Sequence, residues 1–294
     1  MSIFITGSSG FIGTYFLDYF RNEVTNVSSK GKESKIYGNQ VVIHLAGKAH
    51  DLKHTFTPDD YYLVNTELTQ KLFDTFLESQ AKVFITLSSV KAVADEVEGE
   101  LTEQHFPNPN THFGKSKLLA EEYILSKNIP DWKRIYILRP CMIHGPGNKG
   151  NLNLLYKLVS KNITWPLGAF ENKRSFSSID NLMFIFKELI EREDIPSGIY
   201  NVADDEPLST NELIGLMAQA QNKNPKIWNI SKKFIEGVAS IGDKLHLPLN
   251  TERLQKLTSS YVVSNAKIKA AIGKPLPVSS REGLLKTFQS FNSK

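Results

Sequence analysis

A glycine-rich loop near the start of the chain constrains the fold more than any other feature. The apolar segment at residues 3–5 is followed by Thr6-Gly7-Ser8-Ser9-Gly10-Phe11-Ile12-Gly13, and apolar residues then recur at helical spacing. In a strand-to-helix turn, Gly7 allows the tight turn, Gly10 lets a pyrophosphate approach the backbone, and Gly13 lets helix and strand pack closely. The free N–H groups at the start of the helix favour an anion. The loop therefore predicts dinucleotide binding, with a plain strand-to-helix connection as the alternative.

Short apolar runs and helical patterns alternate through the first half of the chain. The predicted strands are residues 3–5, 41–46, 82–87 and 135–138, and the predicted helices are residues 11–20, 68–77 and 114–126. This alternation is typical of βαβ units around a parallel sheet. The predicted fold class is therefore α/β, with a doubly wound parallel sheet of the Rossmann type.

The second half is less regular and predicts a smaller domain. Prolines and glycines between Pro140 and Gly150 interrupt regular structure, and helices near 152–160 and 181–191 precede a strand at 198–202 that returns to the sheet. We predict a dinucleotide-binding domain over residues 1–165, with a return at about 175–205. A smaller C-terminal α/β substrate domain would then comprise about 166–174 and 206–294.

Charge and cysteine content narrow the class of protein. The chain has 35 Lys and Arg against 31 Asp and Glu, and this net charge of +4 is scattered, so we expect a small anionic ligand and no nucleic acid. The single cysteine, Cys141, excludes an intrachain disulfide. No apolar run is long enough for a membrane span, and the apolar strand begins at once, so we expect a cytoplasmic protein without a signal peptide or membrane insertion.

The choice of dinucleotide depends on the segment after the second predicted strand. An NAD-binding site of this type places an acidic residue about twenty positions after the loop, and residues 24–32 contain no carboxylate. Ser28, Ser29 and Lys30 could instead bind a 2′-phosphate, which favours NADP(H) and leaves NAD(H) possible. An exposed polar turn is the alternative interpretation. The segment between the glycine loop and His44 is also short, which indicates a reduced adenosine pocket.

Later motifs resemble, in order and spacing, the extended short-chain dehydrogenases/reductases of the nucleotide-sugar epimerase/dehydratase group. The matching segments are residues 41–47, Asn65, Ser88-Ser89, Phe113-Gly114-Lys115-Ser116-Lys117, Leu138-Arg139-Pro140, residues 144–147, residues 172–176, residues 198–202 and residues 257–260. The resemblance covers nearly the whole chain. Residues 88–91, 145–151 and 166–168 look most like the members that act on UDP-N-acetylhexosamines, as 4-keto-6-deoxy sugar reductases or 4-epimerases.

The resemblance implies a catalytic set with one departure from the family pattern. Family members use a serine, a tyrosine that exchanges the proton, and a lysine four residues after the tyrosine that lowers its pKa. Ser89 and Lys117 match the serine and the lysine, but the tyrosine position is Phe113. Three accounts stay open: an engineered Tyr-to-Phe change, a natural enzyme in which Ser89 and water or His112 supplies the proton, and a protein that binds its ligands without turnover.

Other site residues follow from the same resemblance. The cofactor-binding set is Gly7, Ser9, Gly10, Phe11, Ile12, Ser28, Ser29, Lys30, Leu45, Ala46, Gly47, Lys117, Pro140 and Ile143. The substrate-binding set is Ser89, Lys91, Asn151, Arg174 and Arg253, in which the cations would hold a diphosphate. His50 and His54 have helical metal-ligand spacing but no acidic third ligand, so we expect no metal site.

The implied function is C4 chemistry on a UDP-sugar. We expect an NAD(P)-dependent enzyme that reduces the C4 ketone of a UDP-4-keto-6-deoxy-N-acetylhexosamine in polysaccharide biosynthesis. A UDP-sugar 4-epimerase or 4,6-dehydratase with tightly bound NAD is one alternative, and a non-catalytic binding protein of the same fold is the other. The helices after Asn65 and Phe113 would pair with a second subunit, giving a homodimer through a four-helix bundle.

Overall fold

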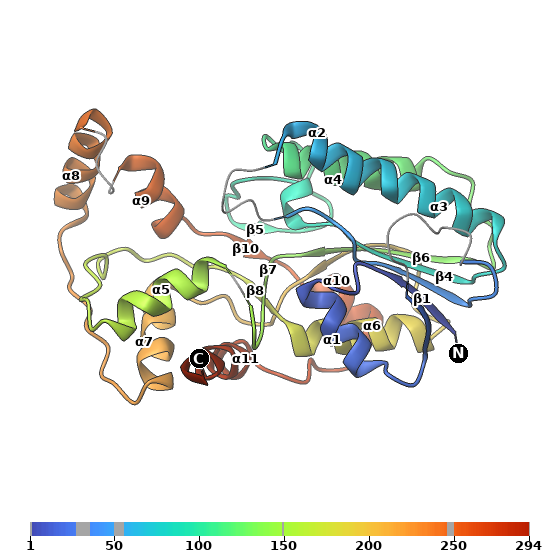
Figure 1. Cartoon of the computed structure of the whole chain (residues 1–294). Helices are drawn as coiled ribbons and strands as arrows, with labels where there is room; N and C mark the ends of the chain where they lie inside the picture. The colour runs from blue at the N-terminus through green and yellow to red at the C-terminus, as the bar shows by residue number, and fades with distance from the viewer. Residues whose placement is uncertain (1, 28–35, 50–55, 149, 246–249, 294) are drawn as a thin grey trace.

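Six parallel strands form the central sheet of the computed structural model, which describes residues 2–27, 36–49, 56–148, 150–245 and 250–293 (Figure 1). The strand order is β2-β1-β3-β4-β6-β9. The strands are β1 Ile3–Thr6, β2 Val24–Val27, β3 Val41–His44, β4 Val83–Leu87, β6 Arg134–Pro140 and β9 Gly198–Val202. Because β2 lies on one side of β1 and β3 on the other, the winding direction reverses at β1, which is where doubly wound folds bind ligands. The predicted fold class is confirmed.

Successive residues of each strand point to opposite faces of the sheet, and both faces are covered by helices. Ile3 and Ile5 pack with helices α1 Phe11–Tyr19, α6 Ile179–Glu191 and α10 Ala266–Ile272. Phe4 faces the other way and packs with α3 Leu68–Glu78 and α4 His112–Leu125. Figure 1 shows α3 and α4 on one side of the sheet and α1 and α6 on the other. This two-sided burial explains why the strands read as continuous apolar runs.

Polar caps fix the helix ends that matter for the site. Thr111 precedes α4, and its Oγ accepts a hydrogen bond of 3.1 Å from the Gly114 N–H. Upstream of α3, the short helix α2 Pro58–Tyr61 runs into a π-helical segment at Tyr62–Glu67. Such π-helical turns are rare and cluster at functional sites. Asn65 belongs to this segment, and its side chain is fully buried against Ser116 of α4.

Most remaining elements build a second hydrophobic cluster away from the sheet. They are α5 Asn151–Ser160, α7 Thr210–Ala220, α8 Lys232–Leu245, α9 Thr251–Thr258 and α11 Ser280–Gln289. Two short strand pairs connect this part to the sheet region, β7 Met142–His144 with β8 Phe176–Ser178 and β5 Glu100–Leu101 with β10 Val262–Val263. Leu152, Tyr156 and Val159 of α5 pack in this second cluster. The division into two domains stays a prediction.

The described helices include none that is both long and apolar enough to cross a bilayer.

Candidate active site

The glycine loop after β1 is closed to side chains. Gly7 has a positive φ of 74°, and a Cβ there would lie 2.4 Å from the Ala46 nitrogen. A Cβ at Gly13 would lie 2.2 Å from the Gly7 oxygen, so helix α1 approaches the loop as closely as backbone allows. Gly10 caps α1 without a side-chain hydrogen bond, so backbone N–H groups form this helix N-terminus. A loop lined by backbone atoms, next to a helix start whose N–H groups have no side-chain acceptor from the cap residue, fits a dinucleotide pyrophosphate.

The segment that follows β3 lies against this loop and is held by Asn65. The Asn65 Oδ1 accepts a hydrogen bond of 2.8 Å from the Lys48 N–H, and its Nδ2 donates to the Lys48 carbonyl and to Ser116 Oγ, both at 3.0 Å. Leu45 and Ala46 are half-buried beneath Gly7, and Gly47 is exposed. Asn65 therefore ties the predicted cofactor-binding residues 45–47 to helix α4.

A buried ammonium lies at the end of β4. Lys117 Nζ donates a hydrogen bond of 2.8 Å to the Leu87 carbonyl, and a Cβ at Gly47 would lie 3.1 Å from the same Nζ. Burial lowers the Lys117 pKa to about 8, although the Glu121 carboxylate opposes the shift. Burial, with the Lys117 charge, also lowers the pKa of His44 to about 3, so this ring is neutral. The site thus combines one buried cation with an uncharged neighbour.

The remaining members of the predicted catalytic set lie where α4 meets the end of β4. Ser89 caps the 3-10 turn Val90–Ala92, and its Oγ accepts a hydrogen bond of 3.2 Å from the Lys91 N–H. A Cβ at Gly114 would lie 2.3 Å from the Lys91 oxygen, so the first turn of α4 packs directly on that turn. Phe113 is half-buried there, with its ring edge-to-face with Tyr61 at a centroid distance of 6.3 Å. This packing brings Ser89, Phe113 and Lys117 into one region.

Two cations from different elements lie near one another beside α9. Arg174 Nε donates a hydrogen bond of 3.0 Å to the Ser259 carbonyl, and its Nη2 donates to the Lys256 carbonyl, so the guanidinium caps the end of α9. Lys91 Nζ donates to the Asp95 carbonyl at 2.7 Å and lies 4.1 Å from the centre of the Tyr261 ring. Burial lowers the Lys91 pKa, the Arg174 charge lowers it further, and Asp95 opposes both. An anion placed beside such a pair would relieve their repulsion.

The other predicted site residues are spread over several elements of the chain. Arg253 is exposed on α9, and Asn151 begins α5 with its side chain outside the described part of the chain. Pro140 is buried at the end of β6, Ile143 is half-buried in β7, and Ser9, Phe11 and Ile12 lie in the loop and first turn of α1. Ser28, Ser29, Lys30, His50 and His54 lie outside the described residues. No group of three potential metal ligands occurs among the residues that the structure describes.

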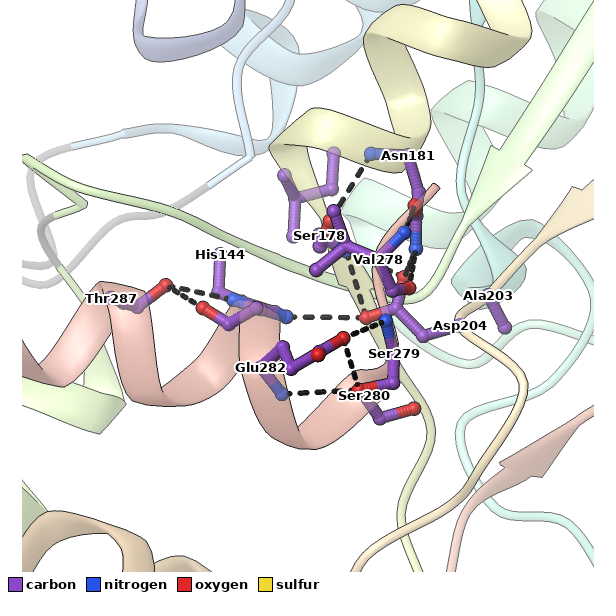
Figure 2. Close-up of polar contacts among 12 residues, drawn as sticks. His144, Ser178, Asn181, Ala203, Asp204, Val278, Ser279, Ser280, Glu282 and Thr287 are labelled. Atoms are coloured by element: carbon purple, nitrogen blue, oxygen red, sulfur yellow. Dashed lines mark hydrogen bonds and ion pairs between the residues drawn. The ribbon is translucent and has the colours of Figure 1, made fainter. Parts of the chain in front are cut away.

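A buried polar network holds the segment after β7, and Figure 2 shows its members. Asp204 accepts hydrogen bonds from the Ser178 N–H at 2.9 Å and from Asn181 Nδ2 at 2.7 Å, and its Oδ2 lies 3.3 Å from His144 Nε2. His144 Nδ1 lies 2.9 Å from Thr287 Oγ1. The network joins β7, β8, α6 and α11, which come from both halves of the chain.

Both ring nitrogens of His144 have a polar partner in this network, Thr287 Oγ1 beside Nδ1 and Asp204 Oδ2 beside Nε2. Thr287 Oγ1 also donates to the Gly283 carbonyl. The side chains of His144 and Asp204 are both fully buried. The residue after His144 is Gly145, where a Cβ would lie 3.3 Å from the Phe11 ring. The network thus fixes the loop that covers the first residue of α1.

Several of these partners are not predicted by the sequence. Asn65 stands out only as a motif residue, and no pattern points to Tyr61, Asp204 or Tyr261. The sequence also does not predict the buried ion pair in which Arg139 Nε and Nη2 both donate to the Glu121 carboxylate. The spacing of Glu121 four residues after Lys117 on a predicted helix could have indicated that it faces the sheet beside that lysine.

Comparison with known proteins identifies relatives over the whole chain. A family model described as the 3-beta hydroxysteroid dehydrogenase/isomerase family matches residues 24–231. A UDP-glucose 4-epimerase from Vibrio cholerae is 29% identical over an alignment of 323 positions, which covers 99% of this chain and 95% of that protein. An N-acetyl-alpha-D-glucosaminyl-diphospho-ditrans,octacis-undecaprenol 4-epimerase from Escherichia coli O157:H7 is 26% identical over 245 positions, covering 76% of this chain and 73% of that protein.

A reductase and two solved structures extend the comparison. A GDP-6-deoxy-D-mannose reductase from Pseudomonas aeruginosa is 24% identical over 247 positions, covering 74% of this chain and 79% of that protein. A UDP-glucuronic acid 4-epimerase from Bacillus cereus, solved with NAD, superposes with a TM-score of 0.76 and 18% identity, covering 100% of this chain and 99% of that one. RMD from Pseudomonas aeruginosa, solved with NADPH, has a TM-score of 0.73, 18% identity and the same coverage. At this identity the two structures establish the fold.

Proposed function

Because this chain belongs to the 3-beta hydroxysteroid dehydrogenase/isomerase family and is an extended short-chain dehydrogenase/reductase, we propose that it is an NAD(P)-dependent enzyme that acts at C4 of a nucleotide sugar. The observation that carries the proposal is the placement of Lys117. Its buried ammonium lies between Gly47 and the end of β4, next to the segment that packs on the glycine loop. An ammonium at that place could donate hydrogen bonds to the nicotinamide ribose of a dinucleotide whose pyrophosphate would bind at Gly10.

The proposed substrate is a UDP-N-acetylhexosamine derivative. Lys91 and Arg174 supply two cations from different elements, which suits a diphosphate, and a diphosphate is common to UDP-sugars and to polyprenyl-diphosphate sugars. The Vibrio cholerae relative is named for a UDP-sugar and the Escherichia coli relative for a lipid-linked sugar, so both carriers are kept as candidates.

In the proposed reaction, a bound nicotinamide dinucleotide would supply hydride chemistry at C4 of the sugar. Oxidation of the C4 alcohol also releases a proton from its oxygen, and reduction of the ketone consumes one. Ser89 Oγ would hydrogen-bond the C4 oxygen, and Lys117 would orient the cofactor ribose. Phe113 has no hydroxyl, so we propose that the proton passes through Ser89 and water. His112, the other proton source considered, is exposed, and its Nδ1 lies 3.2 Å from the Tyr62 hydroxyl. We propose that this proton transfer limits turnover.

We propose C4 epimerisation ahead of the C4 keto reduction that the sequence analysis expects. Two relatives that cover most of the chain are named as 4-epimerases, whereas the reductase relative is less similar. The two reactions differ in how the dinucleotide is used. An epimerase regenerates its NAD in every cycle and holds it tightly, and a reductase exchanges NADPH for NADP at each turnover.

Identification of the dinucleotide tests this assignment. We would denature the purified chain, release any bound dinucleotide and identify it by mass spectrometry, and then measure turnover with UDP-N-acetylglucosamine and its 4-keto-6-deoxy derivative. Retained NAD with interconversion of the two 4-epimers supports the epimerase. Exchangeable NADPH with consumption of the ketone supports the reductase. A chain that binds neither dinucleotide would refute both.

We also propose that the chain forms a homodimer through α3 and α4. Leu63 of the π-helical turn and Leu119 of α4 are 54% and 45% exposed, although both belong to elements that pack together. Large exposed apolar side chains on paired helices are typical of a helical dimer interface. Leu119→Glu should convert a dimer to a monomer in light scattering, and an unchanged mass would exclude this interface.

A further inference from the structure

Helix α8 has a second apolar side that nothing in the described chain covers. Its buried side, formed by Ile235, Ala239 and Gly242, faces the second hydrophobic cluster. Adjacent to it, apolar residues recur at helical spacing along the outside of the helix, at Phe234, Val238, Ile241 and Leu245, which we call the α8 stripe. Phe234, Ile241 and Leu245 are 63%, 54% and 64% exposed. Three large apolar side chains on one exposed helix face indicate a binding surface.

Lysines flank the α8 stripe on the side away from the core. At 100° per residue, Lys233 and Lys244 lie next to the stripe, opposite Ile235. Residues 226–258 contain six Lys or Arg and three Asp or Glu, so this segment contributes +3 to a chain whose total is +4. Trp228, six residues before Phe234, is 63% exposed. Aromatic and aliphatic side chains bordered by lysines are typical of helices that lie in a membrane interface.

Helix α8 lies at one end of the molecule, where a flat surface such as a bilayer can reach the α8 stripe. Figure 1 shows α8 and α9 at the end of the molecule farthest from α3, and α8 extends outward from the rest of the chain. Helix α9 packs against α8, and its last carbonyls accept hydrogen bonds from Arg174. The stripe is therefore one helix away from the cation pair of the candidate site.

An anionic bilayer fits this surface better than a second copy of the chain. One exposed helix face falls well short of the roughly 800 Å² that each partner of a stable protein interface buries, and lysine is depleted at such interfaces. Anionic headgroups attract lysines at the membrane surface, while apolar side chains enter the region just below. Charge and hydrophobicity thus favour the same occupant.

We propose that α8 docks this chain peripherally on an anionic bilayer surface through the α8 stripe and its flanking lysines. The consequence for substrate choice rests on the proposed function. A chain held at the bilayer by α8 can receive a sugar diphosphate whose polyprenyl chain stays in the membrane, next to Lys91 and Arg174.

Sedimentation of the full chain with lipid vesicles tests the docking. We expect the chain to sediment with vesicles of phosphatidylcholine containing about one third phosphatidylglycerol, and to stay in solution with phosphatidylcholine alone. Phe234→Gln should lower vesicle affinity about tenfold. Neutralising Lys233 or Lys244 by glutamine should lower it roughly fivefold each. The matched control is Phe106→Gln, since Phe106 is 90% exposed on the loop between β5 and α4, outside α8, and its loss should leave vesicle affinity unchanged.

Several results would overturn the proposal. The first is a chain that does not sediment with anionic vesicles, and the second is equal affinity for both vesicle types. The third is a loss of vesicle affinity for Phe106→Gln as large as that for Phe234→Gln. A Phe234→Gln variant that lowers the oligomeric mass while the parent binds no vesicles would assign the stripe to a second copy. Turnover of a water-soluble UDP-sugar is measured without vesicles, so failure of the proposed function would appear there and leave the sedimentation result standing.

Discussion

Lys117 Nζ lies 2.8 Å from the Leu87 carbonyl oxygen, so a buried ammonium is held directly at the carboxyl end of β4. Burial moves its pKa from 10.5 to about 8. A lysine that loses affinity for its proton on folding costs the folded state free energy while it remains charged. The residue is therefore expected to serve binding at the expense of stability.

Replacement of Lys117 by methionine should stabilise the chain at pH 7 by about 1–2 kcal/mol, after allowance for the lost hydrogen bond to Leu87. Between pH 8 and pH 10.5 the folded parent sheds this proton before the unfolded chain does, so parental stability rises with pH and the gain shrinks. Urea unfolding at the two ends of this range measures both effects. Lys115→Met, exposed on the same helix, should stay within about 0.5 kcal/mol of the parent throughout. A constant difference between Lys117→Met and the parent would contradict this account.

Gly13→Ala should abolish dinucleotide binding and destabilise the chain by more than about 2 kcal/mol, because its Cβ would meet backbone of the glycine loop at 2.2 Å. The matched control is Gly215→Ala. Gly215 also lies within a helix, α7, and no atom lies within 4 Å of its added Cβ. That variant should gain about 0.5–1 kcal/mol. Thermal unfolding and dinucleotide titration compare the two, and equal effects would show that the loop is not closed as described.

Arg174→Ala should raise the KM for the UDP-sugar at least tenfold while changing the dinucleotide Kd less than twofold, because this cation lies near Lys91 and its hydrogen bonds go to the end of α9. The substitution also uncaps α9, so a second variant separates the two effects. Ser259→Ala removes one partner of the guanidinium, at 2.9 Å, and keeps the charge. It should leave the KM nearly unchanged. An equal rise in both constants for Arg174→Ala would remove the residue from the substrate site.

Asp204→Asn should destabilise the chain by about 2–3 kcal/mol, because an amide nitrogen would replace one of the buried carboxylate oxygens that accept from the Ser178 N–H and face His144 Nε2. The next residue provides the control. Asp205 is exposed and pairs with Lys269 at 2.8 Å, so Asp205→Asn should cost less than about 1 kcal/mol. Urea unfolding measures both costs. Equal costs for the two variants would contradict the role given to Asp204 in the buried network.

The sequence predicts the sheet and its ligand edge because local patterns encode them. The glycine loop needs no distant partner to be recognised, and strands buried on both faces appear as apolar runs whatever lies beside them. Lys117 follows the same rule, since its place is set by a helix that begins at a threonine cap three residues before Gly114.

Long-range partners could not be predicted in this way. Strands β5 and β10 are two residues long and join segments about 160 residues apart, so neither carries a periodic signal. The ion pair of Arg139 with Glu121 and the contact of His144 with Asp204 depend on which strands become neighbours. Arg174 is an example. The sequence predicts it only as a diphosphate ligand, and the structure shows that its guanidinium also donates to the Lys256 carbonyl at the end of α9.

Turnover of Phe113→Tyr with a UDP-N-acetylhexosamine is the most direct test of the central claim that this site is built for nicotinamide-linked chemistry at C4 and lacks only its proton donor. Because the Phe113 ring is only half-buried, we expect an added hydroxyl to leave the ring in its place beside Tyr61. A positioned general acid or base contributes about 10²–10⁴-fold, so kcat should rise by at least 10²-fold while the dinucleotide Kd stays the same. No gain in kcat across UDP-sugars, with dinucleotide still bound, would contradict the claim.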